Sequence, residues 1–443
     1  MKRRSLPMHF KRRRLLSAAA GGFLGAGLAT PRIWASAPTK MYEGKLLVTL
    51  QLDGGADVTQ LCDPKKNTRG EPIINHWAES REPGVVGNLQ YAPIADNERL
   101  FKRFGRDMLV INGVDSQTNS HETGKLYNWT GANAEGAPSL TALHAANAAA
   151  ERPLSYSVFG GMSRTAGIIS YNRLDNLEHL RTLSKPGVNP WDGHARRPDA
   201  EISMARQWVV DDVNYLLTQP GLSARERAHI ARFSRAREGR AGLEVLAEII
   251  PPEEQLMRRE DFNVGGQNLS SDLKQQMQGA LLVFKSGLGA SADMALNGFD
   301  SHENHDAVSE ALFGHLTEAL FFFWDYAEEL GLADRIVMVI GTDFGRTNFY
   351  NDGNGKDHWP IGSYMIIEKD APWGNRVVGL TDDLHFAQPI DARTLRSSKT
   401  GVRLTPAHVN LALRHYLGMD TFADDMGHRL RDTELLPFFD TFI

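Results

Sequence analysis

Short runs of Val, Ile, Leu and Met recur along the chain, and several of them end in an aspartate or a glycine. Five such runs stand out, at residues 45–53, 107–114, 292–300, 335–343 and 363–368. Runs of this length and composition are typical of strands that are buried on both faces of a parallel sheet. Residues 307–331 instead have apolar side chains at helical spacing, and they end at a glycine. This alternation predicts a three-layer α/β fold with a central, mostly parallel sheet.

The middle of the chain has a different pattern. Residues 140–290 contain long stretches with helical spacing, and loops are expected around Pro186, Pro190 and Pro198. We expect this part to be a largely helical insertion or cap on the α/β domain rather than a separate domain. The α/β domain itself is expected to span residues 38–443.

Residues 1–37 have the three parts of a secretory signal. A basic start is followed by a moderately apolar stretch at residues 15–30, and small residues then lead to Ala35 and Ala37, either of which fits a cleavage site. The apolar stretch is shorter than the roughly 20 residues that span a bilayer, so no stable membrane span is expected.

Arg12 and Arg13, with two leucines after the next residue, resemble the twin-arginine consensus. This pattern predicts export of the folded chain by the twin-arginine translocase, and a periplasmic or secreted location.

The net charge of the chain limits the classes of molecule that it can bind. The chain has 49 Lys and Arg against 54 Asp and Glu, which gives a formal net charge of −5. Residues 1–37 carry eight of the basic residues and no acidic one, so the formal charge of the remaining chain is −13. A chain this acidic argues against a nucleic-acid partner, because binding to phosphates needs clustered Lys and Arg. Cys62 is the only cysteine, so an internal disulfide is excluded.

Candidate chemistry lies where the predicted strands end. Three of them end in an aspartate, namely Asp53, Asp300 and Asp343, and His302 and His358 follow two of these closely. Ligands of open α/β sheets bind at the carboxyl ends of the strands. Carboxylates and imidazoles that converge there are ligands for a divalent metal, and Zn or Mn suits the histidines better than Ca. The sequence therefore predicts a metal site at this edge of the sheet.

Four segments resemble the domain-of-unknown-function 1501 family (DUF1501). They read "LDGGADVTQLCDPKK", "SHETGKLYNWTG", "FDSHENH" and "GTDFGRTNFYNDGNGKDHWP", and the last is the longest and most specific. The resemblance runs from about residue 45 to residue 417. It implies an alkaline-phosphatase-like fold and the metal-site layout of that superfamily, and many members of the family are exported by the twin-arginine route. It implies no particular substrate.

The superfamily layout implies one metal site formed by Asp300, His302 and His358. His305 is the alternative to His302, because the superfamily more often places that histidine later in the segment. This site keeps three protein ligands and leaves a position for water or substrate.

The layout also implies a second metal site, with Asp53 and Asp343 as ligands. Here the chain departs from the pattern, because Phe344 stands where a histidine usually follows the aspartate.

The nucleophile position departs from the pattern as well. Counting back ten residues from Gly131 leads to His121, preceded by Ser120, where the superfamily has Ser, Thr or a modified Cys. His121 is then a metal ligand that replaces the missing imidazole, a covalent nucleophile, or a structural residue at a helix start. If His121 is a ligand, no covalent nucleophile is left at this position except the hydroxyl of Ser120. Attack by metal-activated water is then favoured.

Arg346 follows the strand end at Asp343, and its fork of donors suits a phosphate or sulfate. The alternative is a structural salt bridge to a carboxylate of the site. Asp357 is a candidate partner that orients the imidazole of His358.

Two functions remain open on these grounds. The first is an exported metal-dependent hydrolase or transferase that acts on phosphate or sulfate esters, with one or two Zn or Mn ions. The second is a catalytically weakened relative that binds an anionic envelope polymer or takes part in envelope assembly.

Overall fold

The computed structural model describes residues 42–441, apart from 175–176, 186, 190–193, 228, 231–232, 234–239 and 265–266. The predicted export signal at residues 1–37 lies outside the described residues. Within the described part of the chain, no helix combines the length and apolar character needed to cross a membrane.

An eight-stranded sheet forms the centre of the fold, in the order β14-β4-β13-β10-β1-β9-β5-β6. Its strands are β1 (Leu46–Asp53), β4 (Met108–Asp115), β5 (Tyr156–Val158), β6 (Asn172–Arg173), β9 (Ser291–Asn297), β10 (Ile336–Thr342), β13 (Ile361–Ile367) and β14 (Arg376–Val378). Neighbours are parallel except at β13, which runs antiparallel to both β10 and β4. All five predicted strand runs are in this sheet, and the predicted mostly parallel α/β class is confirmed.

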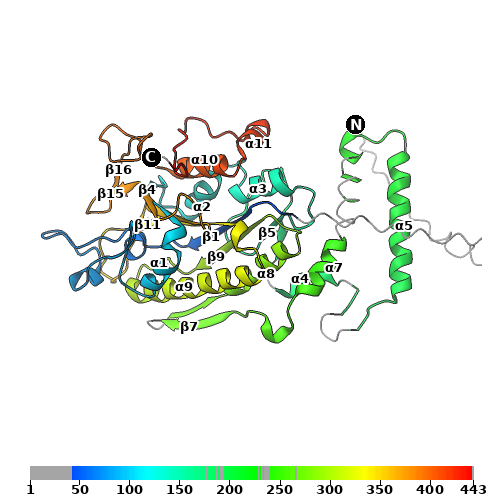
Figure 1. The fold of residues 1–443 in the computed structure, drawn as a ribbon, viewed down its shortest axis with the longest axis horizontal. Coiled ribbons are helices and arrows are strands. Elements are labelled where there is room, and N and C mark those ends of the chain that lie inside the picture. Colours follow the sequence, from blue (N-terminus) through cyan, green and yellow to red (C-terminus); the bar gives the residue numbers. More distant parts are fainter. Residues whose placement is uncertain are drawn as a thin grey trace, which may run out of the picture. The chain divides into compact units, whose positions relative to one another are not determined.

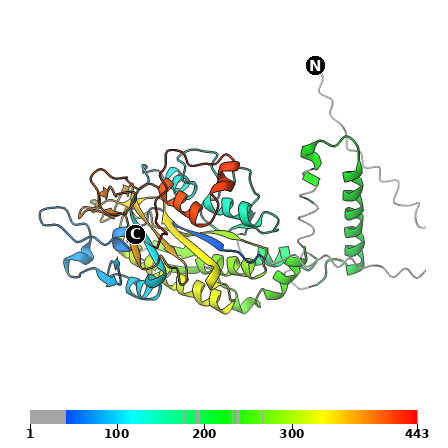
Figure 2. The same ribbon diagram turned by 45° about the horizontal axis from the view of Figure 1, so that its top comes forward.

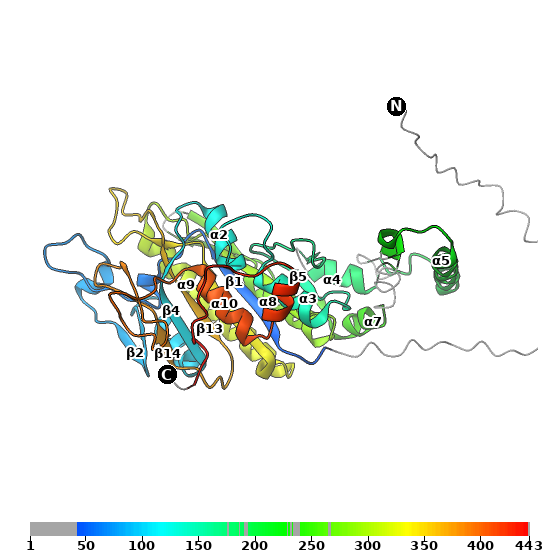
Figure 3. The same cartoon turned by 90° about the horizontal axis from the view of Figure 1, so that it is seen from above.

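Helices cover both faces of the sheet (Figures 1 and 2). One face is covered by α1 (Asn97–Phe104), α8 (Leu273–Lys285) and α9 (His305–Glu329), and the other by α2 (His121–Thr130), α3 (Leu140–Ala149) and α10 (Pro406–Tyr416). Figure 1 shows α2 and α10 on one side of β1 and α9 on the other, and Figure 3 shows the same ribbon from above.

The side chains of β1 divide between two hydrophobic cores. Leu46, Val48 and Leu50 belong to the core under α8 and α9, whereas Leu47 belongs to the core under α2 and α10. Successive side chains of a strand point to opposite faces, so an unbroken apolar run produces a strand that is buried on both sides. This is the physical reason why the five runs could be recognised.

The predicted insertion region contains further helices and a hairpin. These are α4 (Leu177–Ser184), α5 (Asp199–Thr218), α7 (Arg240–Ile249) and the antiparallel pair β7 (Glu260–Val264) and β8 (Gln267–Ser271). The same region also supplies α3, β5, β6 and α8 to the central layers. The limits of a cap within residues 140–290 stay a prediction.

Shorter elements complete the described chain. They are β2 (Gly84–Val86), β3 (Leu89–Tyr91), β11 (Gly345–Arg346), β12 (His358–Trp359), β15 (Leu380–Thr381), β16 (Ala387–Gln388), α11 (Asp420–Asp425), and the 3-10 helices at Val58–Gln60, His76–Glu79, Gly105–Asp107, Glu253–Gln255 and Ala333–Arg335. The two-stranded ribbon of β11 and β12 pairs Arg346 with His358.

The loops after β1 and β9 meet closely at Gly54. A Cβ atom at this position would lie 2.5 Å from the backbone nitrogen of Asp300, and the residue has a φ of +110°. Both observations require glycine, because any side chain would collide with the neighbouring loop and strain the backbone. The loops that follow the two central strands β1 and β9 are thereby held against each other.

Candidate metal centre

The first turn of α2 packs directly on the end of β10. A Cβ atom at Gly124 would lie 2.6 Å from the carbonyl oxygen of Asp343, so only glycine allows the helix to come this close. His121 is the first residue of α2. The packing therefore places the start of α2 beside the loops that follow β9 and β10.

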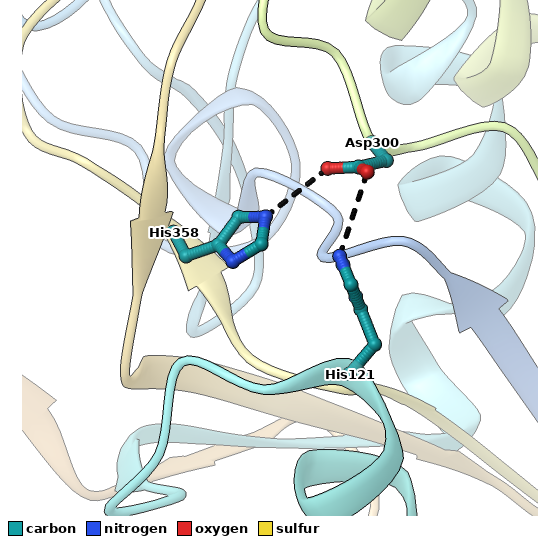
Figure 4. Close-up of side chains that lie close together, drawn as sticks. All are labelled: His121, Asp300 and His358. Atoms are coloured by element: carbon teal, nitrogen blue, oxygen red, sulfur yellow. Dashed lines mark hydrogen bonds and ion pairs between the residues drawn. The ribbon is translucent and has the colours of Figure 1, made fainter.

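Three side chains from separate elements converge there, as Figure 4 shows. His358 Nε2 lies 3.2 Å from Asp300 Oδ1, and His121 Nε2 lies 3.5 Å from Asp300 Oδ2. Asp300 follows β9, His358 is on β12 and His121 begins α2. One ligand atom from each residue lies within 4.8 Å of the other two.

His302 joins this cluster, and His305 does not. The Nε2 atom of His302 lies 3.0 Å from Asp300 Oδ1 and 3.1 Å from His358 Nε2. The ring of His305 is buried, and its nitrogens contact Ser301 and Asp57 instead. Of the two histidines left open by the sequence, His302 is the one that lies at the cluster, and its role as a ligand stays a prediction.

Each of the three imidazoles is held at its other nitrogen. Nδ1 of His121 lies 2.6 Å from Asp343 Oδ2, and Nδ1 of His302 lies 2.7 Å from Asp357 Oδ1. Nδ1 of His358 lies 2.8 Å from the carbonyl oxygen of residue 119. When Nδ1 donates to such an acceptor, the Nε2 lone pair is left for a metal. Asp357 was expected to orient His358, but it contacts His302, and a backbone carbonyl holds His358 instead.

Three of these residues, His121, Asp300 and His358, are close enough together to hold a divalent ion, and His302 contacts two of them. The Nε2 atom of His121 is buried and has no hydrogen-bond partner. For a tetrahedral zinc ion with bonds of about 2.0–2.1 Å, neighbouring ligand atoms lie about 3.3 Å apart. The cluster's contacts at Asp300 and between His302 and His358 measure 3.0–3.5 Å. Three imidazole nitrogens and one carboxylate oxygen also suit Zn or Mn by ligand type.

Asp343 contacts the cluster only through His121. Its carboxylate is completely buried and accepts hydrogen bonds from Gln51 Nε2, from the Gly54 backbone nitrogen and from His121 Nδ1. The hydrogen bond between His121 and Asp343 raises the pKa of His121. The role of Asp343 as a direct metal ligand stays a prediction. In this arrangement its carboxylate orients the imidazole of His121.

Asp53 faces a cation of α2. Its Oδ1 atom lies 3.3 Å from Lys125 Nζ, and the same ammonium lies 3.0 Å from Glu122. Burial, together with the negative charge of Asp343, raises the pKa of Asp53. The role of Asp53 as a metal ligand likewise stays a prediction.

Arg346 is completely buried, and its guanidinium is surrounded by protein oxygens. It donates to the carbonyls of Gly54, Gly55 and Lys356, and to Asp300 Oδ1 at 2.7 Å. Partial burial opposes ionisation of Asp300, but the guanidinium outweighs this and lowers the pKa of that carboxyl to about 2. Substrate binding by Arg346 stays a prediction, while the structural salt bridge considered as its alternative is present.

Ser120 is the residue before α2. It is exposed, and its side chain does not cap the helix. Its role as a nucleophile stays a prediction.

Sequence reasoning did not identify two cations near the site. Lys125 follows His121 by four residues, so a helix that begins at His121 would have predicted both side chains on one face. Lys356 lies two residues before His358 and is completely buried against Asp57. Nothing in the local sequence indicates that burial, because its partner is 299 residues away.

Solved structures to which this chain is similar include a protein of the alkaline phosphatase superfamily and a sulfatase. A Bacteroides thetaiotaomicron protein, solved in connection with the metabolism of glycosaminoglycans, is 10% identical, with a TM-score of 0.40 and coverage of 90% of this chain and 78% of that one. A Vibrio parahaemolyticus protein of the alkaline phosphatase superfamily is 9% identical (TM-score 0.36, coverage 85% and 67%). The PsFucS1 sulfatase from Pseudoalteromonas is 11% identical (TM-score 0.32, coverage 78% and 66%).

Comparison with curated proteins gave no match. Residues 254–398, which include Asp300, His302, Asp343 and His358, match the model of the family described as "Protein of unknown function (DUF1501)". The resemblance of this chain to the DUF1501 family is therefore confirmed over that segment.

Proposed function

We propose that this chain is a metal-dependent hydrolase or transferase that acts on phosphate or sulfate esters. One observation carries the proposal: the imidazoles of His121, His302 and His358 and the carboxylate of Asp300 converge from three separate segments, with contacts of 3.0–3.5 Å that are close to the spacing of ligands around one divalent ion. A divalent ion in such a site supplies a water of lowered pKa and a positive charge for the ester oxygens.

The residues around the cluster prepare it for this chemistry. Asp343 and Asp357 fix two of the imidazoles by hydrogen bonds to Nδ1, so little reorganisation is needed when a metal binds. Arg346 keeps Asp300 ionised, because the pKa of that carboxyl is about 2. Asp300 is then a charged ligand throughout the neutral pH range.

Charge explains why an anionic ester needs a metal here. Five carboxylates lie in or beside the cluster, and two cations accompany them, Lys125 and Arg346; the carboxylates are those of Asp53, Glu122, Asp300, Asp343 and Asp357. With neutral imidazoles the formal charge is −3, which repels an anion. One divalent ion brings the formal charge to −1.

Hydrolysis of model phosphate and sulfate esters by the purified protein, with added Zn, Mn, Mg or Ca, tests the proposal. We expect turnover that disappears with a chelator and returns with one of the metals. A protein that binds metal but hydrolyses no ester would favour a binding role, such as the capture of an anionic envelope polymer. The start of α2 favours this second candidate, because His121 stands where the superfamily layout implies a hydroxyl or thiol-derived nucleophile, and Ser120 beside it is exposed.

The pair His121→Ala and Ser120→Ala separates ligand from nucleophile. Loss of a ligand weakens metal binding but leaves the other three in place, so excess metal should restore part of the activity of His121→Ala. Unchanged metal content with a loss of turnover that no metal rescues would instead identify a covalent nucleophile. Ser120→Ala is the matched control, because it changes the adjacent hydroxyl and leaves the imidazole intact.

A further inference from the structure

Lys125 lies on the same side of α2 as His121. Residues four apart in a helix are neighbours on its surface, so both side chains leave α2 toward the strand ends. The ammonium of Lys125 lies 3.3 Å from Asp53 Oδ1 and 3.0 Å from Glu122 Oε1. The side chain retains 18% of its exposure, so it is in contact with solvent.

The two carboxylates expected to hold a second metal ion have other partners. Asp53 faces the Lys125 ammonium. Asp343 has no exposed surface, and both of its oxygens accept hydrogen bonds from the protein. A second divalent ion would have to displace a cation from Asp53 and donors from Asp343. Both carboxylates therefore have partners within the protein and do not need a second ion.

Lys125 also differs from the other cation of the site. Arg346 is fully buried and directs hydrogen bonds to four oxygens of the protein. An ammonium has three N–H donors, and the two carboxylate contacts of Lys125 leave one of them for another oxygen. Of these two cations, only Lys125 is in contact with solvent and has a donor to spare.

We propose that Lys125 is the second cation of the site, standing in place of a second metal ion beside Asp53 and binding the anionic oxygens of the substrate. This inference rests on the proposed function, because it assumes one divalent ion at the cluster of His121, His302, His358 and Asp300. It assigns the anion contact to Lys125 rather than to Arg346.

The test compares the wild type with Lys125→Gln and Lys125→Arg. The metal content of each protein is measured after saturation with Zn²⁺ and gel filtration, and the affinity of the metal-loaded protein for inorganic phosphate is measured by calorimetry. Lys369→Gln is the matched control for the loss of one positive charge. Lys369 pairs with Asp334 next to the start of β10, at the end of the strand opposite the site.

We expect one Zn²⁺ per chain in the wild type and in every variant. Phosphate affinity should fall about 10- to 100-fold in Lys125→Gln, since a hydrogen bond to a charged group is lost, and should be largely retained in Lys125→Arg and Lys369→Gln. Circular dichroism of Lys125→Gln establishes that the fold is intact.

Two results would overturn the inference while leaving the metal-dependent function in place. One is two Zn²⁺ ions per wild-type chain, a measurement that needs no variant. The other is equal phosphate affinity in the wild type and Lys125→Gln, including no binding by either. A wild-type protein that binds no divalent metal would refute the proposed function itself, and with it the role of Lys125.

Discussion

Next to the candidate metal centre, Lys356 and Asp57 form an ion pair with no exposed surface. Lys356 Nζ lies 2.6 Å from Asp57 Oδ2, and His305 Nε2 lies 3.0 Å from the same oxygen. Burial opposes ionisation of Asp57, but the ammonium and the imidazole hold its pKa far below the usual range. The pair joins the loop after β1 to the loop before β12, and the Lys356 carbonyl accepts a hydrogen bond from Arg346.

Lys356→Met should lower the free energy of unfolding by about 3–5 kcal/mol, because it leaves the Asp57 carboxylate buried without its cation. Urea unfolding at pH 7 measures the effect. The double variant Asp57→Asn/Lys356→Met should recover part of the loss, since it removes both charges. A Lys356→Met protein as stable as the wild type would show that the pair is not buried as described.

Asp293 predicts a pH dependence of stability. It is buried on β9, where Thr49 and Tyr156 donate hydrogen bonds to it, and burial raises its pKa to about 6. Between about pH 4 and pH 6 the folded chain keeps a proton that the unfolded chain releases. The contribution of Asp293 is therefore fully present below pH 4 and is lost as the pH rises through 6.

Asp293→Asn cannot titrate, so the wild type should lose stability relative to this variant between pH 4.5 and pH 7.5. The change should be about 2 kcal/mol, because pH 4.5 lies about 1.5 units below the pKa of about 6 and each unit corresponds to about 1.36 kcal/mol. Urea unfolding of both proteins at the two pH values gives the comparison. A stability difference that is the same at both values would contradict the raised pKa of Asp293.

At the scale of elements, the seating of α2 on β10 determines where His121 and Lys125 lie. Gly124→Ala would place a methyl group 2.6 Å from the Asp343 carbonyl and push the helix away. We expect a loss of about 1–3 kcal/mol in stability, as for other overpacked sites. Zinc affinity, measured by competition with a chelator, should also fall at least about tenfold, because His121 would move away from the other ligands.

Gly314→Ala in α9 is the control for this substitution. A Cβ atom at Gly314 would meet no atom within 4 Å, so the helix should gain about 0.5–1 kcal/mol and zinc affinity should be unchanged. If Gly124→Ala binds zinc as tightly as Gly314→Ala, the position of α2 does not control the site.

Elements with a strong local pattern were the ones predicted from the sequence. The five apolar runs and the helix at 307–331 correspond to β1, β4, β9, β10, β13 and α9. The strands β5, β6 and β14 have only two or three residues each, too few for a recognisable period. The antiparallel direction of β13 depends on how the chain crosses between strands, which no local pattern encodes.

The site was predictable in part for the same reason. Asp300, His302 and His358 each follow or end a recognisable segment, and the structure brings them together. The grouping of His121 with them depends on contacts between loops that are hundreds of residues apart. Hydrogen bonds to Asp343 and the burial of Arg346 are likewise tertiary features, and only the structure shows which carboxylates face the cluster and which support it.

For the whole molecule, export remains a prediction that rests on Arg12 and Arg13. Replacing both by Lys should leave unprocessed precursor in the cytoplasm, because the twin-arginine route depends on the pair. Fractionation followed by immunoblotting shows where the protein accumulates. Normal processing of the double variant in the periplasm would refute the assignment to this route.

We propose that His121, His302, His358 and Asp300 together bind one divalent metal ion. Anomalous diffraction at the zinc edge, from crystals of the protein loaded with Zn²⁺, shows which residues hold the ion. We predict one strong peak about 2.0–2.2 Å from the three Nε2 atoms and from an oxygen of Asp300. No peak at this cluster, or a peak held by Asp53 and Asp343 instead, would refute this set of ligands.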